Sequence, residues 1–190
     1  MKKYLLVCLM ILWFFFTAAA GSYASDVVNK KKQTELGLYI TAQEAFAKWN
    51  EQSGKVKILD VRTPGEYLFV GHAAMAANVP VKFLTGEYDP QKKKPVMPDN
   101  KHFVEDVKKK FSSADTIMVM CRSGSRSAMA VNLLAKAGFK HVYNIVDGFE
   151  GDALKMTASY NNGKRVVNGW KNSGAPWTYE LNPNLVYLPK

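Results

Sequence analysis

Short apolar runs and helically spaced apolar residues alternate along the chain. Four runs have the length and composition of strands, at 55–61, 77–81, 116–120 and 142–146. Between these runs, apolar residues recur at helical intervals over 42–49, 103–111 and 127–137. Strands that alternate with helices favour an α/β fold, in which a central, mainly parallel sheet carries helices on both faces.

Capping and turn residues mark the ends of the predicted helices and loops. Thr41 and Glu44 have the spacing of a capping box, and Pro64 suits the first position of a short helical turn that ends at Gly71. The segment 84–101 contains three prolines, a glycine and a run of three lysines. We therefore predict a surface loop there.

The amino-terminal segment has the pattern of a secretory signal peptide. Two lysines precede an apolar run over residues 5–20, and small residues follow it. We predict that residues 1–24 are removed and that the protein is periplasmic or otherwise exported. An uncleaved N-terminal membrane anchor is the alternative, since the apolar run is slightly short for a full span. A lipoprotein signal ending at Cys8 is disfavoured because only seven residues precede that cysteine.

The rest of the chain divides into three parts. Residues 25–37 are polar and lysine-rich without periodicity, which is typical of a flexible lead-in. Residues 38–151 hold the alternating strands and helices and form the domain. Residues 152–190 make an irregular C-terminal extension whose aromatic side chains we expect to pack on the domain, namely Tyr160, Trp170, Trp177, Tyr179 and Tyr187.

The composition is that of one basic, globular domain. A chain of 190 residues that is 47% hydrophobic and 22% charged excludes disorder of the whole chain. The formal net charge is +10, and without the two lysines of the signal segment it is 24 minus 16, or +8. This excess serves solubility or attracts small anions or an acidic partner surface. Nucleic acid is not an expected partner of an exported protein.

Cys121 is the candidate catalytic residue. Without the signal segment it is the only cysteine, so the chain has no internal disulfide. It directly follows the apolar run 116–120, and ligand sites of parallel sheets lie at the carboxyl ends of strands. The small residues and two arginines at 122–127 let backbone N–H groups and positive charge converge on the sulfur and favour the thiolate. A buried, inert cysteine is the alternative, but it would not need these neighbours.

No metal site is predicted. The three histidines, His72, His102 and His141, are scattered and have no metal-ligand spacing with one another or with Cys121. His72 has no recognisable acid or hydroxyl partner beside it, so we interpret it as structural.

Four motifs follow one another in a fixed order over about residues 36–151. They are Leu59-Asp60-Val61-Arg62 with Glu66-Tyr67, then Gly71-His72-Ala73 with Ala77-Asn78-Val79-Pro80, then Cys121-Arg122-Ser123-Gly124-Ser125-Arg126, and finally Asp147-Gly148-Phe149. In this order they resemble the rhodanese-like family of thiosulfate sulfurtransferases. Any one motif alone is weak, whereas the four in order are specific.

The resemblance implies sulfur transfer through Cys121, without a metal or organic cofactor. Cys121 would take a sulfane sulfur from a small anionic donor such as thiosulfate, hold it as a persulfide, and pass it to cyanide or a thiol. Arg126 would also bind the anionic donor. The residues that bind the sulfur would be Arg122, Ser123, Gly124, Ser125 and Arg126. The residues that support the loop would be Asp60, Arg62 and Ser127, with an ion pair between Arg62 and Glu66.

Two other functions stay open from sequence. Rhodanese-like phosphatases share the fold, but their loop has one more residue than the C-x4-R spacing of Cys121 and Arg126, which favours sulfur over phosphate. A non-enzymatic sulfur carrier or partner-binding module of the cell envelope would have the same motifs. We expect a monomer, with membrane contact only through an uncleaved signal segment.

Overall fold

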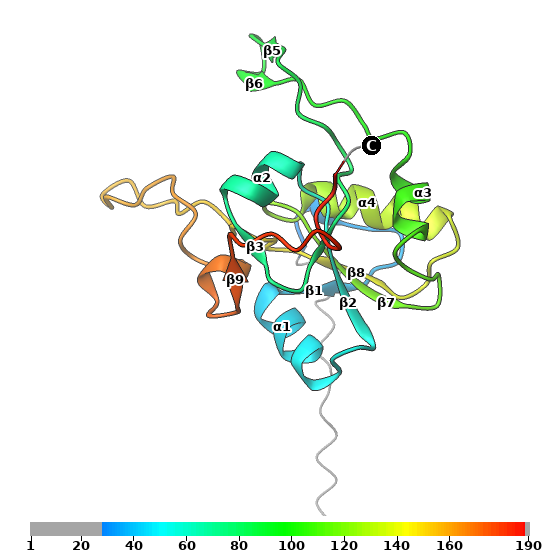
Figure 1. The fold of residues 1–190 in the computed structure, drawn as a ribbon. Coiled ribbons are helices and arrows are strands. Elements are labelled where there is room, and N and C mark those ends of the chain that lie inside the picture. The colour runs from blue at the N-terminus through cyan, green and yellow to red at the C-terminus, as the bar shows by residue number, and fades with distance from the viewer. Residues whose placement is uncertain (1–27, 189–190) are drawn as a thin grey trace, which may run out of the picture.

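A five-stranded parallel sheet forms the centre of the protein (Figure 1). The computed structural model describes residues 28–188, and the predicted signal segment 1–24 lies outside them. The strand order is β1-β8-β7-β2-β4, with the respective bounds Tyr39–Ile40, Val142–Ile145, Thr116–Met120, Val56–Asp60 and Ala77–Asn78. Each pairing in this sheet is parallel, which confirms the predicted α/β fold.

Helices cover both faces of the sheet, and β7 is buried between them. Ile117 and Val119 lie in the apolar cluster on one face, with residues of α3 and α4. Met118 and Met120 lie in the cluster on the other face, with residues of α1. The alternation explains why this strand is an unbroken apolar run. The three helices have the bounds Ala42–Glu51 for α1, Phe103–Lys108 for α3 and Ser125–Lys136 for α4.

The register of β2 and β7 positions the candidate site. Asp60 lies opposite Met120 at the carboxyl ends of the two strands. Val61 then donates its backbone N–H to Met120 O at 2.9 Å. Cys121 therefore lies at the carboxyl edge of the sheet, beside the residues that lead from β2 into the short helix α2 (Pro64–Phe69).

Short strands account for most differences from the predicted elements. β4 ends at Asn78 rather than at residue 81. Val79 still donates its backbone N–H to Asp60 O at 3.0 Å, but the next N–H on the facing side, that of Arg62, bonds the Asp60 carboxylate at 3.0 Å instead of continuing the ladder. The two residues of β1 were not predicted as a strand because so short a segment has no periodicity. The capping box of Thr41 and Glu44, in contrast, begins α1 as predicted.

Most of the segment predicted as a surface loop, residues 84–99 of 84–101, belongs to an antiparallel arm over residues 82–99, which extends away from the sheet in Figure 1. Its tip contains the paired strands β5 (Tyr88–Asp89) and β6 (Lys94–Pro95). Below the tip, the two sides are joined by the backbone hydrogen bonds Thr85 N–H to Val96 O at 3.3 Å and Phe83 N–H to Pro98 O at 2.9 Å. Prolines and lysines in the sequence concealed this pairing because they are typical of loops.

The lead-in is not free of the domain, so the prediction of a flexible segment is wrong for residues 28–37. It forms the short 3-10 helix η2 (Lys30–Lys32). Asn144 donates its side-chain N–H to Lys32 O at 2.8 Å, and Asn132 Oδ1 accepts the backbone N–H of Glu35 at 2.9 Å. Long-range polar contacts of this kind leave no trace in local sequence periodicity.

The C-terminal extension contacts the domain at two places. Its strand β9 (Trp177–Thr178) pairs antiparallel with β3 (His72–Ala73), next to the 3-10 helix η3 (Trp170–Asn172). Further along, Leu185 O accepts the backbone N–H of Asn78 at 2.8 Å, which covers part of the edge strand β4. Among residues 28–188, no helix is both long enough and apolar enough to cross a membrane.

The predicted aromatic contacts of the extension differ from residue to residue. Trp170 is completely buried and meets Phe46 edge to face, with ring centroids 5.9 Å apart. Tyr160, by contrast, is 91% exposed, so the prediction that it packs on the domain is wrong. Tyr160 belongs to a turn-rich excursion, residues 154–164, which closes on itself through Gly163 N–H to Leu154 O at 2.8 Å.

Candidate active site

The loop that joins β7 to α4 surrounds the sulfur of Cys121 with hydrogen-bond donors. Cys121 is 2% exposed. Its Sγ accepts the backbone N–H of Gly124 at 3.2 Å and the hydroxyl of Ser127 at 3.4 Å. The N–H groups in the first turn of α4 have no acceptors within the helix, and the helix dipole adds positive charge there. The sulfur thus occupies a site that favours negative charge.

The turn after β8 holds the opposite side of this loop. Phe149 and Glu150 donate their backbone N–H groups to Cys121 O at 2.8 Å and to Arg122 O at 2.9 Å. These bonds engage two carbonyls of the loop, and the two hydrogen-bond partners of Sγ, the Gly124 N–H and the Ser127 hydroxyl, are both donors. Gly148 makes the close approach possible, because a Cβ there would lie 2.5 Å from Cys121 O.

Arg126 forms a bidentate ion pair with Glu66 of α2. Its two terminal nitrogens lie 2.6 Å from the two carboxylate oxygens, and both side chains are mostly buried. Burial alone would raise the pKa of Glu66, but hydrogen bonds and the charge of Arg126, with help from Thr63, lower it to about 2. Arg126 was predicted to bind the anionic donor, and in this structure its guanidinium joins α4 to α2.

Asp60 and Arg62 form a completely buried ion pair, with Arg62 Nη2 2.7 Å from Asp60 Oδ2. The predicted pair of Arg62 with Glu66 is therefore wrong, since each has another partner. Arg62 also donates to Gly71 O at 2.8 Å, and its guanidinium carbon lies 4.1 Å from the ring centroid of Phe149. Phe149 in turn donates its backbone N–H to Cys121 O, so the Asp60–Arg62 ion pair supports the Cys121 loop through the ring of Phe149.

The remaining loop residues differ in exposure. Arg122 and Ser125 are exposed, and Ser123 is half-buried. His72 is buried, with its ring stacked on Tyr67 at 3.7 Å between centroids and Nδ1 3.0 Å from Tyr67 O. Over residues 28–188, no cluster of three or more His, Cys, Asp or Glu side chains is arranged to hold a metal ion.

A model of the rhodanese-like domain family matches residues 42–154, which is more than half of the chain. The chain belongs to this family. The match runs from the start of α1 to just beyond the turn that holds the Cys121 loop, so it contains all the residues of the site.

Curated relatives include two thiosulfate sulfurtransferases from Arabidopsis thaliana. The chloroplastic thiosulfate sulfurtransferase 16 is 40% identical over 95 residues, covering 49% of this chain and 70% of the relative. Thiosulfate sulfurtransferase 18 is 39% identical over 110 residues, covering 58% of this chain and 75% of the relative. An uncharacterised protein of Rickettsia prowazekii is 34% identical over 122 residues, covering 64% of this chain and 82% of the relative.

A solved structure shows the same fold. The crystal structure of Rv0390 from M. tuberculosis aligns with a TM-score of 0.58 at 24% identity, covering 74% of this chain and 96% of that one. This likeness supports the rhodanese-like fold of the sheet and its helices, whereas the extension beyond residue 154 lies outside the family match.

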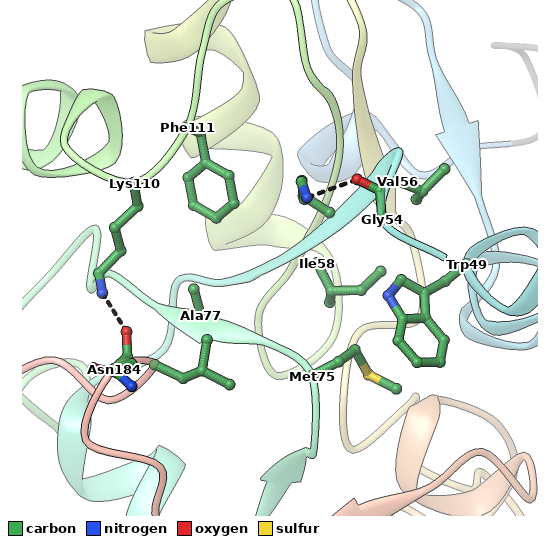
Figure 2. Close-up of a pocket in the computed structure, with 11 residues that line it drawn as sticks. Trp49, Gly54, Val56, Ile58, Met75, Ala77, Lys110, Phe111 and Asn184 are labelled. Atoms are coloured by element: carbon green, nitrogen blue, oxygen red, sulfur yellow. Dashed lines mark hydrogen bonds between the residues drawn. The ribbon is translucent and has the colours of Figure 1, made fainter. Parts of the chain in front are cut away.

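A cavity of about 370 Å³ lies along the amino-terminal half of β2, and none of its lining residues belongs to the Cys121 loop (Figure 2). Apolar side chains from several elements line it, among them Trp49, Ile58 and Met75. Both lysines in its lining donate hydrogen bonds to backbone carbonyls. Lys110 donates to Asn184 O at 2.9 Å, and Lys57 donates to Gly54 O at 2.7 Å. None of the residues that line this cavity is a Cys, Ser, Thr, Asp or Glu.

Replacing Glu66 with glutamine should lower the free energy of unfolding by about 2 to 3 kcal/mol at pH 7, because a buried arginine loses its counter-charge. The pKa of Glu66 is about 2 in the folded protein, against an ordinary value of 4.5 that applies to the unfolded chain. The ion pair therefore contributes its full stabilisation of the folded state above pH 4.5. That stability is lost as the pH falls from 4.5 toward 2, and the difference between wild type and variant should shrink accordingly. Urea unfolding at pH 7 and pH 3 measures it.

The matched control for Glu66 is Glu105→Gln. Glu105 pairs with His102 at 3.1 Å, but both side chains are about 70% exposed or more. Its replacement should change the stability by less than about 0.5 kcal/mol. Equal effects of the two substitutions would show that the pair of Glu66 with Arg126 contributes nothing beyond a surface contact.

Replacing Gly148 with alanine should displace the Cys121 loop. Gly148 has φ 64°, and an added Cβ would meet Cys121 O at 2.5 Å and Ser123 N at 2.7 Å. Gly163 is a control for backbone strain alone, since its φ is 80° and no atom lies within 4 Å of an added Cβ. We expect Gly163→Ala to cost about 1 kcal/mol and Gly148→Ala about 3 kcal/mol or more, with slower alkylation of Cys121 by iodoacetamide. Equal alkylation rates in both variants would contradict this account of the loop.

Proposed function

We propose that this protein is a sulfurtransferase that moves a sulfane sulfur from an anionic donor such as thiosulfate, through a persulfide on Cys121, to cyanide or a thiol. The observation that carries the proposal is the pair of donors on Cys121 Sγ, the Gly124 N–H at 3.2 Å and the Ser127 hydroxyl at 3.4 Å. Membership of the rhodanese-like family and the two relatives named thiosulfate sulfurtransferase support it.

The chemistry consists of two displacements at sulfur. The Cys121 thiolate attacks the terminal sulfur of thiosulfate, the Sγ–S bond forms, and the donor S–S bond breaks with its electron pair leaving as sulfite. The persulfide anion keeps the negative charge, which the donors of the loop stabilise. Cyanide then attacks the outer sulfur, and thiocyanate leaves while the Cys121 thiolate is regenerated.

The size of the loop supports sulfur over phosphate. Only four residues separate Cys121 from Arg126, and Arg126 places both of its terminal nitrogens on Glu66 rather than on the centre of the loop. A transferred phosphoryl group spreads charge over three oxygens and needs several directed donors, including a positive side chain. A single outer sulfur needs fewer.

Mass spectrometry of the intact protein tests the proposal directly. Incubation with thiosulfate should add about 32 Da to the wild type and nothing to Cys121→Ser, and cyanide should remove the added mass with release of thiocyanate. If no adduct forms while the Cys121 thiol stays reduced and titratable, the catalytic proposal fails. A sulfur-carrier or partner-binding module would then be the better account.

A further inference from the structure

The lead-in is connected to the Cys121 loop by one buried side chain, that of Asn144 in β8. Asn144 is completely buried, and its Nδ2 donates one hydrogen bond to Lys32 O at 2.8 Å and a second to Gly124 O at 3.1 Å. These two bonds span 112 and 20 residues of sequence. A single amide nitrogen thus joins the carbonyl of a lead-in residue to the carbonyl of a loop residue.

Gly124 is the loop residue whose orientation matters most for the sulfur. Its N–H donates to Cys121 Sγ at 3.2 Å, the shorter of the two hydrogen bonds that this sulfur accepts. Its φ is 97°, a left-handed conformation that glycine adopts readily, so its own backbone sets few limits on its orientation. The direction of this N–H therefore depends on the groups around Gly124.

Three groups from outside the loop hold Gly124. Two of them confine its Cα, because an added Cβ would collide with Val146 O and would lie 2.9 Å from Lys32 Cδ. The third is Asn144, which holds the Gly124 carbonyl together with the backbone N–H of Ala128, at 3.2 Å. With the Cα confined and the carbonyl bonded twice, the N–H stays directed at the sulfur.

Lys32 is fixed at its side chain as well as at its carbonyl. Its Nζ pairs with Asp152 Oδ1 at 2.9 Å, and the lysine side chain is only 16% exposed. Asp152 in turn accepts the side-chain N–H of Asn168 at 3.1 Å. The lead-in precedes residue 42, where the family match begins, so this support of the loop comes from outside the matched domain.

The remaining atom of the Asn144 amide indicates why an asparagine occupies this position. Within residues 28–188, Asn144 Oδ1 has no hydrogen-bond partner. A buried acceptor without a partner destabilises a fold. The contribution of this side chain therefore comes from Nδ2 and the two carbonyls that it joins.

We propose that Asn144 and Lys32 are positioning residues, which hold Gly124 so that its N–H stays on Cys121 Sγ. The inference rests on the proposed sulfurtransferase function, because this N–H stabilises the negative sulfur of the thiolate and of the persulfide. The lead-in is then part of the reactive unit, although it lies outside the family match.

Asn144→Leu tests the link by removing both hydrogen bonds of Nδ2 at nearly constant side-chain size. We expect kcat for sulfur transfer from thiosulfate to cyanide to fall at least about tenfold, while KM for thiosulfate stays within about twofold. The reason is that the Gly124 N–H contacts the reacting sulfur of the protein rather than the bound donor. Alkylation of Cys121 by iodoacetamide should slow at least about fivefold, since the thiolate is the reactive form.

Asn78→Leu is the matched control for the loss of a buried amide. Asn78 is also completely buried, its Nδ2 donates to Asp60 O at 2.9 Å and to Arg62 O at 3.0 Å, and its Oδ1 has no partner in the described part of the chain. Both variants should lower the thermal unfolding midpoint similarly, but Asn78→Leu should keep kcat and the alkylation rate within about twofold of wild type. Equal losses in the two variants, or wild-type alkylation in Asn144→Leu, would overturn the role of Asn144.

Lys32→Ala and Lys31→Ala test the lead-in itself. Both lysines lie in η2 and each substitution removes one positive charge, so any general attraction of anions changes equally. Lys31 is exposed, whereas the Lys32 side chain lies against Gly124. We expect Lys32→Ala to slow the alkylation of Cys121 about threefold and Lys31→Ala to leave it unchanged. Equal rates in these two variants would refute the contribution of the lead-in.

Alkylation needs no sulfur transfer, so it separates this inference from the proposed function. If the wild type forms no persulfide while alkylation slows in Asn144→Leu and Lys32→Ala, the proposed function fails and the positioning of Gly124 stands. If the wild type forms the persulfide while both variants are alkylated at the wild-type rate, the inference fails and the proposed function stands.

Discussion

Replacing Cys121 with serine should lower kcat/KM for sulfur transfer from thiosulfate to cyanide by at least about a thousandfold. A serine hydroxyl is a far weaker nucleophile toward sulfur, and it has no means of forming a persulfide. The residue is 2% exposed, and serine is close in size, so the fold should persist. Thiocyanate formation measures the effect, and an unchanged thermal unfolding midpoint would show that only the chemistry was lost.

Ser127→Ala gives this prediction a graded comparison. The Ser127 hydroxyl is one of two donors on Cys121 Sγ and its contact of 3.4 Å is the longer, so its loss should cost about tenfold rather than a thousandfold. Activity that survives in Cys121→Ser, or a loss in Ser127→Ala as large as that in Cys121→Ser, would place the reactive group elsewhere.

Replacing Trp170 with alanine should lower the free energy of unfolding by about 3 to 5 kcal/mol, the usual cost of deleting a large buried aromatic side chain. Trp170 is completely buried in the cluster under α1, and its indole N–H donates to Pro176 O at 2.9 Å. The effect would make the C-terminal extension part of the hydrophobic core rather than an appendage. Urea unfolding followed by circular dichroism measures it.

Tyr160→Ala is the control for Trp170, because it removes a large aromatic from the same extension at a position that is 91% exposed. Its effect should stay within about 0.5 kcal/mol. If Trp170→Ala proved equally mild, the sheet and helices would be stable without the extension, and truncation near residue 152 should then leave a folded domain.

Asp147 connects three parts of the structure that the sequence presents separately. Its two carboxylate oxygens accept the backbone N–H of Ala42, at the start of α1, at 2.8 Å and that of Gly169, in the extension, at 2.9 Å. Burial nevertheless raises the pKa of Asp147, since it outweighs these hydrogen bonds. The motif Asp147-Gly148-Phe149 therefore has two roles. Asp147 links α1 to the C-terminal extension, and Gly148 and Phe149 contact the Cys121 loop.

The sequence by itself determined the elements whose signals are local. The apolar run of β7, the small residues after it and the helical spacing of α4 lie within some twenty consecutive positions, so they predicted a strand, a loop and a helix around Cys121. The capping box of Thr41 and Glu44 works over three residues. Such patterns are readable because the residues that cause the structure are neighbours in the chain.

Only the tertiary structure decided the contacts between distant segments. The sequence suggested the nearby Arg62 as the partner of Glu66, whereas the fold brings Arg126 to it from 60 residues away. The pairing of the arm, the burial of Trp170 and the link from Lys32 through Asn144 to Gly124 likewise depend on which surfaces meet. A two-residue strand or a single buried aromatic side chain is too short to show hydrophobic periodicity. The sequence of one segment therefore does not reveal which other segment it contacts.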